Sequence, residues 1–334
     1  MEVGVIVDDV GTHGANTATA WLARALVSRG YGVWMLGAGE LGVDERDRVV
    51  AVARRAPGAG AAPADFMGGV RAAPPEPISV GGLDVLLVRC NPGKGALERW
   101  AWTALLGFCR LAEAEGAVVL NEPGGLSQAL DKLYFHTFPA STRPRGIVSR
   151  SRDALRAFVT SLDGPAVLKP LSGSGGSGVF LVRPPDLSNL NAIIEVLSAS
   201  GFVVAQAYLP EAASGDTRLL MLEGRPLAVD GVIAAVGRRP GGGDLRSNIA
   251  AGGSAVPGVV TPAMLELARR VGPRLQTDGV FLAGLDVIGD KLVEINVFSP
   301  GGLQDASAFT GVDFAAPIAE AMERRVNYSM KSLS

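Results

Sequence analysis

Three side chains in the last quarter of the chain are spaced so that one metal ion could bind all of them. Asp286 precedes a Gly289-Asp290 turn, and Glu294 and Asn296 follow it. Apolar residues on both sides of the turn predict a two-stranded hairpin. Glu294 and Asn296 are two positions apart, so their side chains leave the same strand face, and hairpin pairing would bring Asp286 opposite them.

Carboxylate and amide oxygens suit magnesium that keeps water and phosphate oxygens as its other ligands, with manganese as the alternative ion. The other interpretation of this hairpin is a solvated surface turn without a ligand. The apolar residues Ile288, Val293 and Ile295 argue against that interpretation, because carboxylates on an otherwise buried strand need a partner.

A glycine-rich segment, residues 173–178, matches the letters GxGxxG of a dinucleotide-binding loop. That fingerprint needs a helix after the loop, whereas the apolar run 179–182 predicts a strand. No Lys-Ser/Thr pair follows the glycines, which excludes a Walker A loop, and Lys169 precedes them on the incoming strand. We therefore predict a hairpin flap whose amides cover phosphates and which orders on nucleotide binding, the alternative being a flexible surface hairpin.

Composition limits the classes of function. A chain of 334 residues predicts two or three lobes, and a formal charge of -2 gives no case for a nucleic-acid or membrane partner. Two cysteines without a CxxC motif and two histidines argue against a zinc site or a disulfide framework. No apolar run reaches membrane-spanning length, and the first residues predict a strand rather than a signal peptide, so we expect a cytoplasmic protein.

The elements that must position these motifs begin with a strand, a helix and a second strand within residues 3–36, which favours a doubly wound parallel sheet. Residues 56–82 are rich in Ala, Gly and Pro and predict an extended surface excursion. A helix is expected at 126–135, carrying Lys132. The residues after 326 have no periodicity and predict a frayed tail.

The motifs occur in the order found in the ATP-grasp superfamily, and the chain resembles the prokaryotic glutathione synthetase family. The resemblance is dense between residues 121 and 300 and thin before them. It is carried by Lys132, Leu168-Lys169-Pro170-Leu171, Gln206-Ala207-Tyr208-Leu209-Pro210, Gly215-Asp216-Thr217-Arg218, Asn248-Ile249-Ala250-Ala251-Gly252-Gly253, Gly284-Leu285-Asp286, Glu294-Ile295-Asn296 and Ser299-Pro300.

This resemblance implies an α/β (α+β) ATP-grasp fold behind an N-terminal doubly wound parallel sheet. It divides the chain into an N-terminal Rossmann-like pre-ATP-grasp domain (1–122), a lid subdomain with the glycine-rich loop (123–204), a catalytic subdomain (205–326) and a flexible tail (327–334).

The resemblance also implies a role for each motif residue. ATP would be bound by Lys132, Lys169, Gly173, Ser174, Gly175, Gly176, Ser177, Gln206, Ala207, Tyr208, Leu209 and Asp216, with Asp216 near the ribose. Magnesium ions bridging the β- and γ-phosphates would be held by Asp286, Glu294 and Asn296. The transferred phosphate and the acyl acceptor would face Arg218, Arg238, Asn248 and Gly252, and the substrates would contact Arg89, Asn91, Ser299, Pro300 and Gly301.

The implied reaction is ATP-dependent amide formation through an acyl phosphate, which joins γ-glutamylcysteine to glycine. The resemblance also implies a homo-oligomer, a dimer or a tetramer. Small molecules would be the partners. Where the family has an acidic motif after Arg89, this chain has residues 90–95, Cys-Asn-Pro-Gly-Lys-Gly. Together with His13, that change keeps open a peptide ligase of a specialised pathway with other substrates, and a third alternative is an idle nucleotide-binding module.

Overall fold

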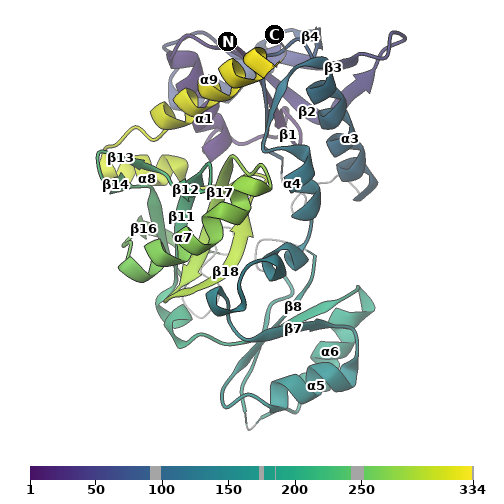
Figure 1. Ribbon diagram of the computed structural model, residues 1–334, viewed down its shortest axis with the longest axis vertical. Helices are drawn as coiled ribbons and strands as arrows, with labels where there is room; N and C mark the ends of the chain where they lie inside the picture. Colours follow the sequence, from purple (N-terminus) through teal and green to yellow (C-terminus); the bar gives the residue numbers. More distant parts are fainter. Residues whose placement is uncertain (91–98, 173–176, 185, 242–251, 333–334) are drawn as a thin grey trace.

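The computed structural model describes residues 1–90, 99–172, 177–184, 186–241 and 252–332. Figure 1 shows three parts along the long axis: a six-stranded sheet with its helices, a second six-stranded sheet in the middle, and a four-stranded sheet at the far end. This confirms the mixed α/β class. Among the described residues, no helix combines the length and the apolar character needed to cross a bilayer.

The N-terminal sheet has the strand order β4-β3-β2-β1-β5-β6. Strands β2, β1, β5 and β6 are parallel, and β3 and β4 are antiparallel additions at one edge. The apolar, β-branched run in β1 is buried on both faces, as is typical of a parallel strand covered by helices. The strands are β1 (Glu2–Val7), β2 (Gly32–Val43), β3 (Val49–Arg55), β4 (Pro75–Ser79), β5 (Val85–Val88) and β6 (Val118–Leu120).

Helices α1 (Ala18–Ser28), α2 (Pro63–Ala72) and α3 (Arg99–Glu115) accompany this sheet. The predicted surface excursion at 56–82 is wrong, because α2 and β4 lie there. Phe66, Met67 and Val70 recur at helical spacing and are fully buried, so a short apolar stripe anchors α2 despite its small neighbours.

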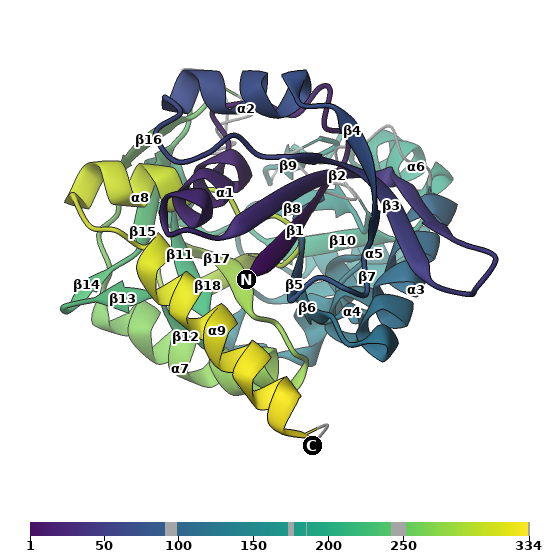
Figure 2. The same cartoon turned by 90° about the horizontal axis from the view of Figure 1, so that it is seen from above.

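The chain ends in helix α9 (Ala315–Ser332), which lies beside α1 and packs into the N-terminal core. Figure 2 shows α9 crossing this end of the molecule. The predicted frayed tail is wrong for the residues up to 332, which continue the helix. Burial of Ile318, Met322 and Val326 holds the preceding turns, and extending a formed helix by a few residues costs little.

The small sheet belongs to the predicted lid and has the order β7-β10-β8-β9, antiparallel throughout. Helices α5 and α6 pack on it, and together they bury a separate apolar cluster. Leu168 of β8 pairs with Phe180 of β9, so the glycine-rich segment joins two strands as predicted. The elements are β7 (Gly146–Ser149), α5 (Arg152–Thr160), β8 (Ala166–Pro170), β9 (Phe180–Val182), α6 (Leu190–Ala199) and β10 (Val203–Ala207).

Between the N-terminal sheet and the lid, the single helix predicted at 126–135 is wrong. The chain forms α4 (Pro123–Gln128) and then the 3-10 helix η1 (Lys132–Thr137), followed by η2 (Ala140–Thr142). The Asp131 carboxylate accepts a hydrogen bond from the Leu133 amide at 2.8 Å and caps η1. A new helix start at Asp131 competes with continuation of α4, which explains the break.

The central sheet has the order β16-β15-β11-β17-β18, with β12 paired to β11. The predicted hairpin is confirmed as β17 and β18, with Asp286 opposite Glu294 and a register irregularity after Asp286. The elements are η3 (Pro210–Ser214), β11 (Asp216–Leu222), β12 (Arg225–Pro226), β13 (Ala228–Val229), β14 (Val232–Ile233), β15 (Ala235–Arg239), β16 (Ser254–Pro257), α7 (Pro262–Thr277), β17 (Leu282–Ile288), β18 (Lys291–Asn296) and α8 (Leu303–Thr310).

The N-terminal and central sheets form one body with shared apolar clusters. The buried Asn121 amide joins them: its Oδ1 accepts from the Leu282 amide at 2.7 Å, and its Nδ2 donates to the Leu282 carbonyl at 2.9 Å. The lid therefore has its own core, whereas the other two sheets share theirs.

Candidate active site

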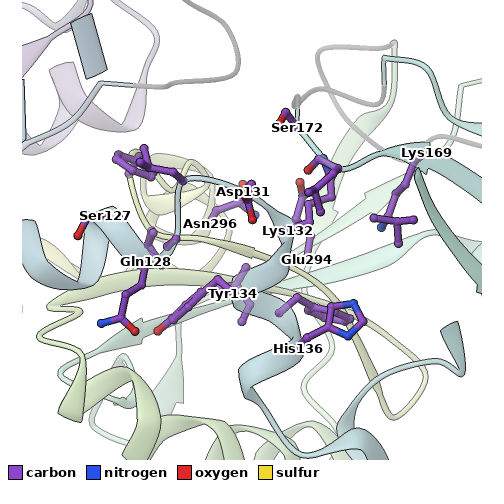
Figure 3. Close-up of a pocket in the computed structure, with 18 of the residues that line it drawn as sticks. Ser127, Gln128, Asp131, Lys132, Tyr134, His136, Lys169, Ser172, Glu294 and Asn296 are labelled. Atoms are coloured by element: carbon purple, nitrogen blue, oxygen red, sulfur yellow. The ribbon is translucent and has the colours of Figure 1, made fainter. Parts of the chain in front are cut away.

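A cavity of about 520 Å³ lies where the lid, the α4–η1 segment and the hairpin strand β18 meet. Figure 3 shows Lys132 and Glu294 in the middle of its wall, with Lys169 toward the lid and Ser127 and Gln128 on the other side. The lining combines charged and other polar side chains with aromatic and aliphatic ones. It includes Trp102, Gln128, Asp131, Lys132, Tyr134, Phe135, His136, Lys169, Ser172, Gln206, Glu294, Asn296 and Ser299.

Two lysines reach this cavity from different elements. The Lys132 ammonium donates to the Leu171 carbonyl at 3.2 Å, which ties η1 to the end of β8. Burial lowers the pKa of Lys132, and burial also lowers the pKa of Lys169 to about 8, against the opposing effect of Glu294. Two partly desolvated cations beside one carboxylate form a site that favours an anionic ligand such as a polyphosphate.

Asp286 is the most enclosed charge of the site, with a side chain 1% exposed. Arg218 donates to both its oxygens, from Nε at 2.7 Å and from Nη2 at 2.8 Å. Arg238 Nη2 lies 2.7 Å from Asp286 Oδ2, and Asn296 Nδ2 donates to the same oxygen at 3.2 Å. Burial would raise the pKa of Asp286, but the two guanidinium groups, Arg218 first, hold it well below its usual range.

A second carboxylate completes this cluster. Asp216 lies opposite Arg238 in the β11–β15 pairing and accepts from Arg238 Nε at 2.7 Å. Burial works to lower the pKa of Arg238, but Asp286 and Asp216 outweigh it and raise that pKa above its ordinary value. Asp216 therefore supports an arginine and does not line the cavity, and its predicted position near a ribose remains a prediction.

The predicted metal donors differ in what they can offer an ion. Glu294 and Asn296 both line the cavity, and because Asn296 turns its Nδ2 to Asp286, its Oδ1 is left for other contacts. Burial and the nearby Asp286 charge raise the pKa of Glu294, a penalty that a bound cation would remove. Asp286, by contrast, is occupied by two arginines. Within the described part of the chain, no group of three or more His, Cys, Asp or Glu side chains is placed to hold a metal ion, and the third oxygen donor predicted here is the Asn296 amide.

The segment predicted for the adenine pocket is partly on the cavity wall. Gln206, 8% exposed, lines it. The amides of Ala207 and Tyr208 donate to the carbonyls of Arg145 and Pro165 at 2.8 and 2.9 Å. Within the described residues, the Leu209 amide has no such acceptor, so it is a backbone hydrogen-bond donor that this segment can offer a ligand.

Of the residues predicted to contact the substrates, Arg89 follows β5 and is buried against Thr19 and the Pro300 carbonyl. Ser299 lines the cavity, and a Cβ added to Gly301 would lie 3.9 Å from Arg218 Nη1. Residues 299–301 therefore form a short bridge between Arg89 and Arg218.

Several predicted residues lie outside the described part of the chain: Asn91, Gly173, Ser174, Gly175, Gly176 and Asn248. Their neighbours are described. Ser177 is exposed, and Gly252 has a positive φ of 95°. A Cβ on Gly241 would lie 2.7 Å from the Gly252 carbonyl oxygen, so Gly241 and Gly252 lie close together.

Sequence reasoning missed much of the cavity wall. Gln128, Tyr134, Phe135 and His136 come from α4 and η1, where the sequence predicted one helix. Asp131 directly before Lys132 was the available signal, because an Asp is favoured as the cap of a new helical turn.

The antiparallel lid sheet, the two lysines and the oxygen donors on β18 agree with the match of residues 131–311 to an ATP-grasp domain. The chain is therefore an ATP-grasp enzyme, an ATP-dependent ligase that forms C–N bonds. Solved structures share this fold at low identity. D-cycloserine synthetase DcsG matches with a TM-score of 0.62 at 15% identity, covering 96% of this chain and 99% of that one. A RimK domain protein ATP-grasp from Sphaerobacter thermophilus matches with a TM-score of 0.60 at 20% identity, covering 96% and 98%.

The chain belongs to the prokaryotic glutathione synthetase family. The model of that family's N-terminal domain matches residues 1–127, and the model of its ATP-grasp domain matches residues 131–311. A glutathione synthetase of Gloeobacter violaceus is 37% identical over 318 residues, 93% of each chain. One from Shewanella oneidensis is 38% identical over 246 residues, 73% of this chain and 74% of that one. The predicted family, ligase class and use of ATP are confirmed.

Proposed function

We propose that this enzyme makes glutathione in the cytoplasm, joining the cysteinyl carboxylate of γ-glutamylcysteine to the amine of glycine with ATP cleaved to ADP and phosphate. The observation that carries the proposal is the cavity in which Lys132 and Lys169 meet Glu294 and Asn296. That set can bind a triphosphate together with a divalent ion, and membership of the glutathione synthetase family supports γ-glutamylcysteine and glycine as the other substrates.

A carboxylate does not react with an amine, because its carbon is electron-rich and oxide is a poor leaving group. Attack of one carboxylate oxygen on the γ-phosphorus of ATP releases ADP and gives an acyl phosphate. The two lysines neutralise charge on the transferring phosphoryl group, the main contribution a protein can make to this step. The amine then attacks the acyl carbon, phosphate leaves, and the ammonium product loses a proton.

In this proposal Glu294 and Asn296 Oδ1 would hold a magnesium ion, and Asp286, which two guanidinium groups already bind, would join them only after one of these groups moved. When bound, the ion supplies charge compensation at the phosphate oxygens. Asp286 keeps Asn296 turned so that its oxygen faces the cavity, and it holds Arg218 and Arg238 as oriented donors for the acyl phosphate. The nucleotide in this proposal lies with its base toward Leu209 and its phosphates toward the lysines.

The glycine-rich hairpin covers the phosphates in this scheme. An acyl phosphate hydrolyses readily, so a closed lid protects it, and holding the amine beside it raises the effective concentration by orders of magnitude. We also propose that the protein works as a homo-oligomer, a dimer or a tetramer, as the family resemblance implies.

The test is release of ADP by the purified protein with Mg-ATP, γ-glutamylcysteine and glycine, next to a panel of other amino acids and dipeptides. Turnover with the glutathione precursors, and glutathione in the product, supports the proposal. Turnover with another pair only would assign the chain to a different peptide ligase. No turnover with any pair, but tight nucleotide binding, would support a non-catalytic module.

A further inference from the structure

A chain of hydrogen bonds behind the cavity wall converges on Asp278, a carboxylate that is 8% exposed. Its Oδ2 accepts from the Tyr134 hydroxyl at 2.9 Å and from Arg274 Nε at 2.6 Å. Arg274 Nη2 in turn donates to Gln128 Oε1 at 3.0 Å. Tyr134 of η1 and Gln128 of α4 both line the cavity (Figure 3). One buried carboxylate therefore holds two residues of the wall, the first directly and the second through an arginine.

The position of Asp278 is not explained by the helix to which it belongs. Asp278 caps the C-terminus of α7, and its amide donates to the Arg274 carbonyl at 3.0 Å. The helix dipole places partial negative charge at this end, so a carboxylate here does not favour α7. Burial adds a cost that only hydrogen bonds or a nearby cation can compensate. What Asp278 stabilises is therefore to be found in the segments that it contacts, α4 and η1.

The backbone of α4 also packs closely on Asp278. A Cβ added to Gly125 would lie 1.9 Å from the Asp278 carbonyl oxygen, so any side chain at this position would force the two segments apart. Just before α4, the Glu122 amide donates to the Gly279 carbonyl at 3.1 Å. These contacts fix the start of the segment that leads to η1, and the Tyr134 hydroxyl fixes η1 itself.

Helix η1 carries Lys132 and depends on contacts outside itself, because a 3-10 helix of six residues has poor hydrogen-bond geometry. Toward the lid, the amide and the ammonium of Lys132 both donate to the Leu171 carbonyl, at 3.3 and 3.2 Å. Toward the body, the Tyr134 hydroxyl donates to Asp278. Burial and this hydrogen bond raise the pKa of Tyr134, so the phenol keeps its proton and stays a donor. The helix is thus held between the body and the lid.

The exact place of Lys132 matters because its ammonium is partly desolvated. Burial lowers the pKa of Lys132, and the charge of Glu294 across the cavity opposes that effect. Where water is excluded, the attraction between an ammonium and a phosphate is strong and depends on their separation. A misplacement of about 1 Å can cost roughly 100-fold in rate. A contact that fixes η1 can therefore act on a bound nucleotide through Lys132.

We propose that Asp278, acting through the Tyr134 hydroxyl, is a positioning residue that holds η1 so that Lys132 faces the nucleotide phosphates. The inference rests on the proposed function, in which Lys132 neutralises phosphate charge, and adds to it a residue that acts without touching the nucleotide. It carries a strict consequence: because Asp278 and the Tyr134 hydroxyl act through Lys132, their effect on nucleotide binding exists only while Lys132 is present.

A double-mutant cycle on Mg-ATP binding tests this consequence, with affinity measured by calorimetric titration in the absence of the other substrates. Tyr134→Phe removes the hydroxyl and keeps the ring, and we expect it to weaken Mg-ATP binding about tenfold. In a Lys132→Gln background the same change should alter the affinity by less than about twofold. The matched control is Tyr31→Phe, which removes a hydroxyl that donates to the Glu323 carboxylate on α9, outside the cavity. It should leave the affinity unchanged in both backgrounds.

Equal weakening by Tyr134→Phe with and without Lys132 would show that the hydroxyl supports the wall in general, and it overturns the inference. Unchanged affinity in Tyr134→Phe overturns it as well. If Lys132→Gln alone leaves the affinity unchanged, the proposed phosphate role of Lys132 fails and the inference fails with it, so this single variant tells the two failures apart.

A second variant, Asp278→Asn, repeats the cycle from the other end of the hydrogen bond and serves if Tyr134→Phe does not fold. It keeps the size of the side chain and removes the charge that Tyr134 and Arg274 bind. We expect a loss of Mg-ATP affinity in the same direction that disappears in the Lys132→Gln background. A loss that persists there overturns the inference.

Discussion

Two groups of buried charges in this enzyme are built in opposite ways. Around Asp286, two carboxylates and two arginines compensate one another: Arg218 and Arg238 bind Asp286, and Arg238 also binds Asp216. Arg89 is buried and Lys169 is half-buried; neither has an ion pair within the described residues, although the charge of Glu294 acts on Lys169. In the cluster around Asp286 every charge is paired without a ligand, so these ion pairs fix the positions of Arg218 and Arg238. Two cations without an ion pair favour an anionic ligand, and under the proposed function these ligands are phosphate and carboxylate groups.

The largest expected effect comes from Glu294, the carboxylate near Lys169 and Lys132. Glu294→Gln keeps the shape but removes the charge that balances a metal ion and the lysines. We expect ADP release to fall by about 10³-fold or more, since such electrostatic stabilisation is usually the largest catalytic contribution. The assay is steady-state ADP release, with the exposed Glu266→Gln on α7 as the matched control. A loss smaller than tenfold would mean that Glu294 lies outside the reaction centre.

Asp286→Asn breaks the cluster around Asp286 and should act on stability as well as on turnover. It leaves Arg218 without a carboxylate and Arg238 with Asp216 alone. Removing one partner of a buried pair typically costs about 3–5 kcal/mol of unfolding free energy, and the retained Asp216 places the expected loss near the lower end. Urea denaturation measures it. The control, Glu223→Gln, breaks partly exposed pairs with Arg324 and Arg325 and should cost about 1 kcal/mol or less. Equal losses in the two variants would contradict the comparison.

Nucleotide binding at Lys169 is expected to depend on pH. Its pKa of about 8 in the free enzyme means that the charge is lost above pH 8, and bound phosphates should raise that pKa. Nucleotide binding near pH 8.5 is therefore expected to take up a fraction of a proton, and affinity should fall as pH rises from 8 toward 10. Calorimetry in two buffers of different ionisation enthalpy measures the uptake. Lys169→Arg should abolish it, because a guanidinium stays charged; uptake that persists in this variant assigns the proton to another group.

The smallest effect is expected at an exposed pair in the lid. Arg152 and Glu195 lie 3.1 Å apart with both side chains more than half exposed. Glu195→Gln should change the unfolding free energy by about 0.5 kcal/mol or less, because solvent screens such pairs. Thermal unfolding of the variant and the unchanged protein tests this, and a shift comparable to that of Asp286→Asn would show that exposure does not separate the two kinds of charge.

The local chemistry of the site could be predicted from the sequence. Glycine and aspartate at a turn between apolar runs specify the β17–β18 hairpin, and alternation along a strand then puts Glu294 and Asn296 on one face. The apolar residues after the glycine-rich loop excluded a dinucleotide site for the same local reason. The predictions of secondary structure were wrong where the local pattern was weak and tertiary packing decided the conformation. Phe66 and Val70 form the buried face of α2, which packs in the N-terminal core. Helix α9 continues to Ser332 because its preceding turns are buried.

The amino-acid sequence by itself determined which residue types could bind phosphate and metal, since side-chain donors and strand periodicity are local properties. Only the tertiary structure decided how the charges combine. Asp216, Arg218, Arg238 and Asp286 come from three strands, and nothing local in the chain shows that their charges cancel. Nor does any motif show that Arg89 is buried without a carboxylate. Electrostatic energy depends on distance and burial in space, and both are set when the sheets pack.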